Sequence, residues 1–303
     1  MISRIYSQVV CPGAEVNKTR DNAHSAWHNF IGLSVIICLL AIPVLKGLWQ
    51  LWHCGRNFDG MMLVPVMCGF ILFKSRNEFA SSIFKPIKKA LYILPATTGA
   101  MLAAWAYDLP RISGLFLVFN LLAASMGIFG YSNWKLSAMP LIFLLLMIPP
   151  PQGAVDFITV NLQRFFSLIM ETLLSSLSSH FIERNGFEFR FTAPNYSIPL
   201  TTECSGIRSL LGFIIISFFL VVVDRHTVLT AVFMLSAGIA TALVLNFARI
   251  LITIQLRLSG QEEYATGSWH GFLGLFVFLI GCAALGRLSG FLKPLNPQNK
   301  EAR

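Results

Sequence analysis

Three residues whose types could together perform nucleophilic catalysis stand near the ends of three separate apolar segments. Cys204 precedes the segment that begins at residue 206, Arg249 lies in the later part of the next, and His270 opens the last. A free thiol is only a few per cent thiolate at neutral pH, but a neighbouring histidine can take its proton and a nearby cation favours the thiolate. The set predicts Cys204 as nucleophile, His270 as general acid and base, and Arg249 as the group that stabilises the oxyanion.

Polar neighbours surround the cysteine at the mouth of its apolar segment. A charge near hydrocarbon costs about 2.5–3.5 kcal/mol at mid-depth, so polar groups there indicate function by default. Each residue also has an ordinary explanation, such as an inert thiol, an arginine that snorkels or an interfacial histidine. Because all three residues are expected at the same face of the membrane, a catalytic role is favoured over these separate explanations. The residues that we expect to position the nucleophile or the substrate are Glu203, Ser205, Arg208 and Asn246.

Composition identifies an integral membrane protein. Of the 303 residues 55% are hydrophobic and only 12% are charged, whereas a soluble domain has about 25% charged residues. The net charge of +9 does not indicate a nucleic-acid partner, because the basic residues lie in short connections between apolar segments. The six cysteines form no CxxC pair and no metal-ligand spacing is visible, so we expect neither a metal nor a cofactor.

The apolar segments predict an all-α membrane fold of about eight transmembrane helices. A span needs about 20 apolar residues, and two of the candidates are short. We expect an N-terminal tail at 1–26, a membrane catalytic domain at 27–292 and a C-terminal tail at 293–303. The predicted spans are residues 27–51, 60–73, 91–107, 112–130, 134–148, 206–223, 228–254 and 271–291.

The distribution of basic residues predicts the orientation. The loop at 74–89 is rich in Lys and Arg, and with the N-terminus inside most basic residues of the chain face the cytoplasm. Both termini are then cytoplasmic, and the candidate catalytic residues face the outer side of the membrane.

Two further elements are expected on the outer face. A proline run at 149–151 ends the fifth span, since proline lacks the amide that a helix interior needs. Residues 154–182 then show an apolar stripe interrupted by charges, which favours an interfacial helix over a ninth span. Residues 187–192 alternate strictly, and 197–200 can return as a second strand after a turn. This small β-hairpin, for which an irregular loop is the alternative, offers an edge to an extended substrate.

The motifs around these residues resemble the exosortase/archaeosortase family, and are most like those of a bacterial exosortase. The stretches that carry the resemblance are ECSGIRS at 203–209, NFARI at 246–250, HG at 270–271, and PLIFLLLMIP at 140–149 followed by Pro151. The resemblance covers about residues 60–292. The family's Cys, Arg and His correspond to Cys204, Arg249 and His270.

The resemblance implies a cysteine transpeptidase of the bacterial inner membrane, with its catalytic residues facing the periplasm, linked to exopolysaccharide production and surface protein sorting. Its substrates would be secreted proteins with a C-terminal sorting tail of the PEP-CTERM type, cut through a thioester and transferred to a lipid or glycan acceptor. Membrane lipids surround the site, and no nucleic acid takes part. A purely hydrolytic protease remains an alternative, because it needs the same residues. A transporter fits less well, since no internal repeat is visible and the charges gather at one face.

Overall fold

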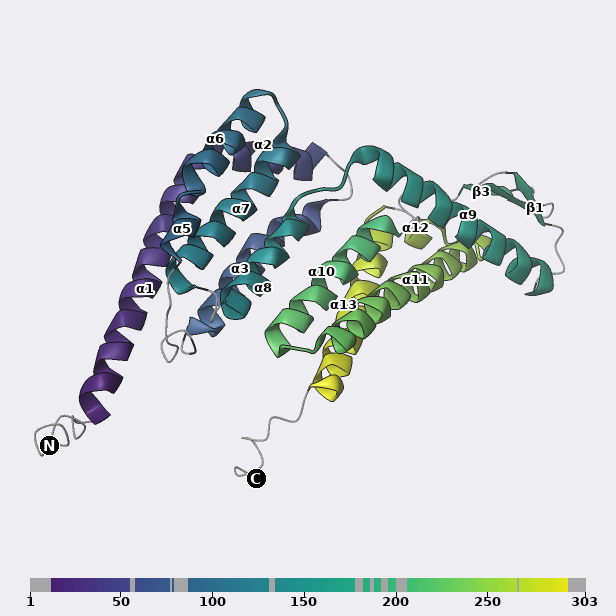
Figure 1. Ribbon diagram of the computed structural model, residues 1–303. Coiled ribbons are helices and arrows are strands. Elements are labelled where there is room, and N and C mark those ends of the chain that lie inside the picture. Colours follow the sequence, from purple (N-terminus) through teal and green to yellow (C-terminus); the bar gives the residue numbers. More distant parts are fainter. Residues whose placement is uncertain are drawn as a thin grey trace, which may run out of the picture. The chain divides into compact units, whose positions relative to one another are not determined.

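The computed structural model describes residues 12–54, 58–76, 78, 87–130, 134–177, 182–185, 188–191, 196–199, 206–265 and 267–293. For some of these, including residues 12–24, the strands and residue 270, the description is limited to the backbone. The chain divides into two compact units, Met1–Pro149 and Pro150–Arg303 (Figure 1).

The first unit is helical and is built around one central helix. Helix α7 begins at Pro110, whose missing amide costs nothing at a helix start, and ends at Phe129 before a glycine with φ 72°. It contacts most other helices of the unit, and its buried residues include Leu117, Val118 and Ala124. The elements of this unit are α1 (Pro12–Leu40), α2 (Ile42–Cys54), η3 (Asp59–Met62), α3 (Leu63–Lys74), α5 (Lys88–Leu91), α6 (Leu94–Ala106), α7 (Pro110–Phe129), α8 (Trp134–Phe143) and η4 (Leu144–Met147).

Proline-rich chain at the end of this unit leaves backbone carbonyls without a helical amide, and side chains supply the missing donors. The carbonyl of Met147 would pair with the amide of residue 151, which is a proline, and it accepts instead from Trp52 Nε1 at 2.8 Å. The carbonyl of Pro149 accepts from Arg111 Nε at 3.1 Å. The proline break is therefore anchored to α2 and α7.

The second unit contains the predicted catalytic segments. Helices α10, α11 and α13 pack against one another over a core of Phe213, Ala242 and Leu285. Helix α9 contacts α10 and leads into a small sheet. The elements are α9 (Gln152–Leu177), β1 (Ile182–Asn185), β2 (Glu188–Phe191), β3 (Tyr196–Pro199), α10 (Ile207–Asp224), α11 (Val228–Leu258), α12 (Glu262–Ala265) and α13 (Gly267–Leu292).

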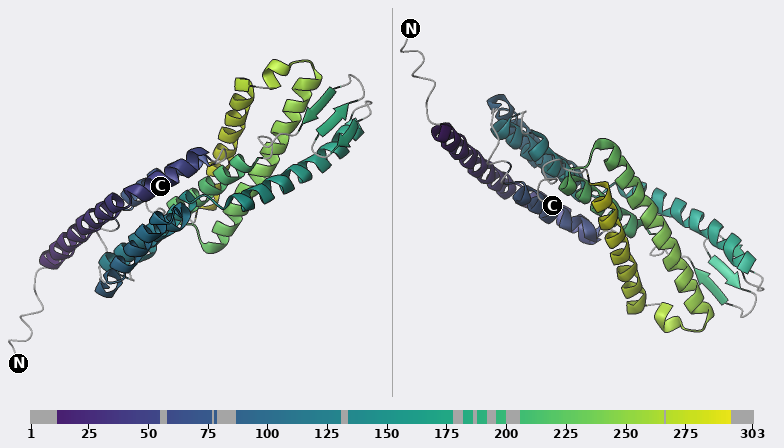
Figure 2. Two further views of the ribbon diagram at one scale, coloured as in Figure 1. Left: turned by 90° about the horizontal axis from the view of Figure 1, so that it is seen from above. Right: turned by 90° about the horizontal axis from the view of Figure 1, so that it is seen from below.

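The sheet is antiparallel in the order β1-β2-β3, and it lies beside the C-terminal part of α9 (Figure 2). Strands β2 and β3 coincide with the expected hairpin, with Glu188 opposite Pro199 and Phe191 opposite Tyr196. The first strand, β1, was not anticipated. It pairs with β2, so β2 is the central strand, and an extended substrate could add only at β1 or β3.

The helical membrane class is confirmed, but the expected number of eight spans is wrong for the part of the chain that the structure describes. Four helices there are long and apolar enough to cross a membrane: Pro110–Phe129, Ile207–Asp224, Val228–Arg257 and Gly271–Leu292. Two interrupted pairs raise the number to six if each pair counts as one span: Ser25–Leu40 with Ile42–His53, and Leu136–Met147 with Gln152–Leu173.

Short and bent helices explain why fewer spans are observed than predicted. Helices α3 and α6 have 12 and 13 residues, which at about 1.5 Å per residue fall short of the roughly 30 Å of hydrocarbon. The first predicted span is bent by 67° at Ala41, just before Pro43. The fifth tightens into the 3₁₀ turn η4 ahead of the proline run.

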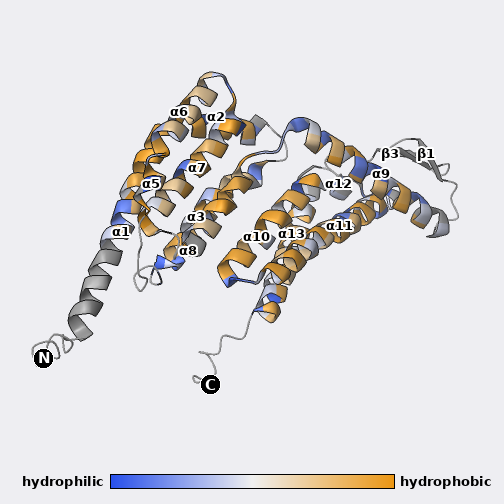
Figure 3. Ribbon diagram, in the orientation of Figure 1, coloured by the Kyte–Doolittle hydropathy of each residue, from blue (hydrophilic) through white to orange (hydrophobic). Residues whose placement is uncertain are grey.

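Helices α10, α11 and α13 of the second unit consist mostly of hydrophobic residues, as expected of helices in lipid (Figure 3). Large apolar side chains such as Phe233, Phe272 and Phe276 are more than half exposed. Helix α9 also exposes Phe157 and Leu168. These helices therefore belong to a multi-pass membrane protein, and the interfacial position of α9 stays a prediction.

Candidate active site

The predicted nucleophile segment ends at the first turn of α10. Residues 201–205, which include Glu203, Cys204 and Ser205, lie outside the described residues. Gly206 is the first described residue that follows them, and it is buried at the N-cap of α10 with φ 76°. This left-handed conformation strongly favours glycine, because a Cβ would meet the backbone. The backbone conformation at residue 206, two residues after Cys204 in the sequence, therefore depends on glycine at that position.

A buried amide from α11 holds this turn in place. Asn246 is only 3% exposed, and a Cβ placed on Gly206 would lie 2.5 Å from its Cγ. No larger side chain fits at residue 206 without displacing Asn246. The chain entering α10 is thus packed directly on α11.

Arg249 lies one turn further along α11 and reaches across to α13. A Cβ placed on Gly274 would lie 3.3 Å from Arg249 Nη1, so the guanidinium rests against the backbone of α13. Gly274 is four residues after His270, which is about one helical turn. The backbone of His270 lies in the first turn of α13, and its side chain is outside the described part. The arginine and the histidine-bearing turn are therefore neighbours on facing helices.

Arg249 is deeper in its helix than the sequence suggested. The predicted span ended at residue 254, whereas α11 continues to Leu258. Arg249 thus stands about two and a half turns before the helix end, and the side chain is only partly exposed. Thr253 Oγ1 donates to the Arg249 carbonyl at 2.9 Å, within the same helix.

The register of α10 and α13 brings their starts to the same level. Gly212 faces Phe278, and Phe213 packs on Gly281, so the contacts advance along both helices in the same direction. Further along, Ser289 bonds Asp224. The two helices are consequently parallel, and the first turn of α10 lies level with the first turns of α13.

Arg208 projects from the first turn of α10 and is exposed. It was predicted to position the nucleophile or the substrate, and its place at the mouth of the helix puts a positive charge within one turn of Gly206. Among the described residues no three His, Cys, Asp or Glu side chains gather closely enough to hold a metal ion.

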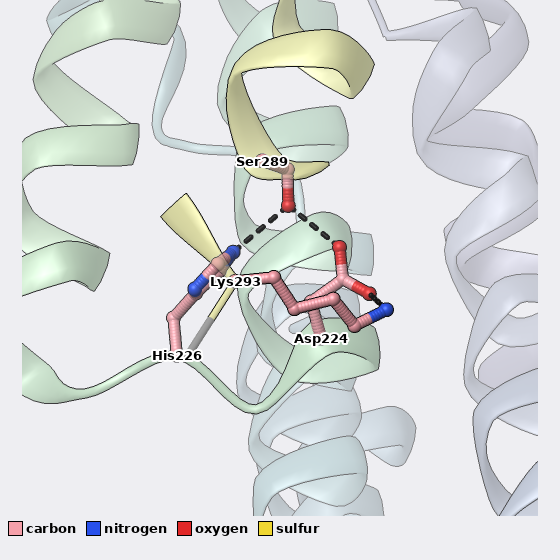
Figure 4. Close-up of polar contacts among 4 residues, drawn as sticks. All are labelled: Asp224, His226, Ser289 and Lys293. Carbon is pink, nitrogen blue, oxygen red and sulfur yellow. Dashed lines mark hydrogen bonds and ion pairs between the residues drawn. The ribbon is translucent and has the colours of Figure 1, made fainter. Parts of the chain in front are cut away.

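The opposite end of the same three helices carries a polar cluster that the sequence analysis missed (Figure 4). Ser289 Oγ donates to Asp224 Oδ2 at 2.6 Å and bonds His226 Nε2 at 2.8 Å, while Lys293 Nζ pairs with Asp224 Oδ1 at 2.7 Å. The sequence does show these four polar residues near the ends of two helices. However, polar residues are common where a helix leaves the membrane, so their sequence positions alone did not indicate a cluster.

Comparison with known protein families shows to which family the chain belongs. A family model described as transmembrane exosortase matches residues 52–286. The chain belongs to the transmembrane exosortase family. The match includes the three motifs that hold Cys204, Arg249 and His270. No match was found among characterised proteins with curated descriptions or among solved structures.

Proposed function

We propose that this exosortase is a membrane cysteine transpeptidase that cleaves C-terminal sorting tails of secreted proteins and transfers the new C-terminus to an acceptor. The observation that carries the proposal is the family match over residues 52–286, because processing of sorting signals is what the family implies. The contacts at Gly206 and Gly274 support it, since they draw the starts of α10 and α13 towards Asn246 and Arg249 of α11.

In the proposed first step Cys204 loses its proton to His270, and the thiolate attacks the carbonyl carbon of the scissile peptide bond. The carbonyl oxygen becomes an oxyanion, which the Arg249 guanidinium faces. Arginine suits this task because it stays charged in a partly apolar site. Removal of a single such donor typically costs about 10²–10³ in rate.

The tetrahedral intermediate then collapses to a thioester. The C–N bond breaks, and His270 returns its proton to the leaving amine, which departs with the membrane-anchored tail. An amine or hydroxyl of the acceptor attacks the thioester, gives its proton to His270 and releases the thiol. Water in place of the acceptor would make the enzyme a hydrolase. A site walled by lipid limits water and favours a lipid-borne acceptor, with a glycan as the other candidate.

The remaining predicted residues have supporting roles in this proposal. Asn246 holds the Gly206 turn and thereby the segment that carries the thiol, and Ser205 and Glu203 belong to that segment. Arg208 is suited to a substrate carboxylate or backbone carbonyl near the cut. The charge distribution of the loops favours a periplasmic site in the inner membrane, with both termini in the cytoplasm.

The test is processing of a co-expressed secreted protein that bears a C-terminal sorting tail. Cys204→Ala should abolish processing at an unchanged protein level. The matched control is Cys282→Ala, which removes another thiol of the same unit and should process the tail normally. Continued processing by Cys204→Ala would end the covalent mechanism.

Mass analysis of the released C-terminus separates transfer from hydrolysis. An added mass on the new carboxyl end supports a transpeptidase. A free carboxylate on every product would make the enzyme a hydrolytic cysteine protease instead.

A further inference from the structure

A partly open cavity of about 360 Å³ lies within the first unit, away from the residues discussed above. It is formed by α2, the end of α6 and the start of α7. Gly47 and Pro110 both line it and lie close together, since a Cβ on Gly47 would lie 3.1 Å from Pro110 Cβ. The volume falls in the range of about 300–1,000 Å³ that is usual for small-molecule sites.

Two opposite charges line this cavity. Lys46 lies in the apolar helix α2, within a segment that counts as half of a bent membrane span. Its side chain is exposed, so the ammonium is free to meet a ligand at the mouth of the cavity. Asp108 follows α6 with φ 55°, an uncommon backbone conformation for any residue other than glycine. In the part of the chain that the structure describes, neither charge is paired with the other or with a third group.

Exposed aromatic residues indicate at which level of the membrane the cavity lies. Trp105 lines it and is 47% exposed, while Trp49 and Tyr107 lie next to it along the chain and are 52% and 80% exposed. Trp and Tyr gather where hydrocarbon meets the lipid head groups. The cavity is therefore expected at head-group level.

We propose that this cavity binds the head group of a zwitterionic phospholipid that carries a primary ammonium. Lys46 pairs with the phosphate, and Asp108 accepts hydrogen bonds from the ammonium, whose charge is also attracted to the face of Trp105. Gln50, which also lines the cavity, has a carboxamide available to the ester oxygens.

The charges themselves select this head group over others. An anionic head group would satisfy Lys46 but bring a negative charge to Asp108, and a quaternary ammonium has no N–H to donate to the carboxylate. A soluble zwitterion would match the charges equally well, but it would lack acyl chains for the exposed apolar surface beside the cavity, which includes Ile42 and Leu109.

The test uses the purified full-length protein, stripped of lipid in detergent. Thermal unfolding is followed with added phosphatidylethanolamine, phosphatidylcholine or phosphatidylglycerol. Phosphatidylethanolamine should raise the midpoint most, by about 2 °C at ten times its dissociation constant. Equal rises for the three lipids would overturn the proposal. Free phosphoethanolamine should have little effect, and an equal rise with it would overturn the lipid assignment.

Variants connect the preference to the two charges. Asp108→Asn should reduce the response to phosphatidylethanolamine to that of phosphatidylcholine, and Lys46→Gln should weaken the response to all three lipids. The control Lys89→Gln removes an exposed charge of the same unit outside the cavity and should respond as the wild type does. Asp108→Gly keeps the left-handed backbone at φ 55° and serves as a second variant if Asp108→Asn unfolds. Full preference for phosphatidylethanolamine in either Asp108 variant would contradict the assignment.

Discussion

The two ends of the α10, α11 and α13 trio carry similar polar residue types but are built differently. At one end Asp224, His226, Ser289 and Lys293 bond to one another through oriented hydrogen bonds and an ion pair. At the other end two glycines, Gly206 and Gly274, allow a buried amide and a guanidinium to approach the backbone of neighbouring helices. The first arrangement ties helix ends together, while the second packs Asn246 on the first residue of the α10 turn and Arg249 on the backbone of α13.

The order of bonds at the first end excludes the catalytic arrangement that its residue types suggest. In a Ser-His-Asp triad the histidine stands between the other two and takes the proton of the serine. Here Ser289 is in the middle, and its only proton goes to Asp224. His226 Nε2 must therefore donate to Ser289 Oγ, so it cannot act as a base for that hydroxyl. The cluster is a structural clasp, although it contains serine, histidine and aspartate.

The largest effect on processing, after loss of the nucleophile, is expected from Arg249. Arg249→Ala should lower the rate of tail processing by about 10²–10³, because an oxyanion donor is lost. Arg249→Lys should recover only a small part, since the ammonium is a point charge on a different stem. Rates of processing at matched protein levels provide the measurement. A full rate in Arg249→Lys would show that charge alone suffices and would weaken the oxyanion assignment.

Gly206→Ala should be the next most harmful change. It requires a left-handed alanine, at a cost of about 1–2 kcal/mol, and it drives a Cβ into Asn246. We expect a loss of processing of at least about tenfold together with a lower thermal midpoint. Gly260→Ala is a matched control, because Gly260 has φ 72° with nothing within 4 Å of its would-be Cβ.

That control separates backbone strain from the contact with Asn246. Gly260→Ala should lower stability by the strain alone and leave processing unchanged. Equal processing by the two variants would mean that the Gly206–Asn246 contact does not position the nucleophile segment.

A smaller change in rate is expected from Gly274→Ala. The added methyl would lie 3.3 Å from Arg249 Nη1, so the guanidinium must shift by a few tenths of an ångström. A processing rate lower by a few fold, with little change in stability, is expected because catalytic groups tolerate small displacements poorly. Gly286→Ala on the same helix, where a Cβ meets open space, is the control. A normal rate in Gly274→Ala would place the guanidinium outside the reaction.

The sequence predicted the helical membrane class and all four long spans of the described residues, with boundaries within a few residues; the fourth is 228–254, observed as Val228–Arg257. Residues 112–130, 206–223 and 271–291 are continuous apolar runs without an internal proline, so periodicity and length sufficed. The prediction failed where helices are short or broken. Local composition does not show that α2 bends away at Ala41, or that Trp52 and Arg111 supply donors to carbonyls at the proline break about 95 and 38 residues away in sequence.

For the candidate site, the sequence proposed residue types, and the contacts between helices came only from the structure. Motifs identified Arg249 and Asn246, but the glycines that receive them lie on other helices, and only three-dimensional packing pairs Gly206 with Asn246 or Gly274 with Arg249. The sequence did not indicate the clasp for the same reason. Asp224 and Ser289 are 65 residues apart, and only packing brings them together.

Substitutions in the clasp test the difference between the two ends most directly, because they should lower stability without affecting processing. Ser289 is fully buried, so Ser289→Ala removes the shared partner of Asp224 and His226 and should destabilise the protein by about 1–2 kcal/mol. Asp224→Asn should cost less, since Lys293 is 56% exposed and its ion pair is screened by solvent. Both variants should process the sorting tail at close to the wild-type rate once corrected for folded protein. An abolished reaction with an unchanged thermal midpoint would assign chemistry to the clasp and remove the distinction between the two ends.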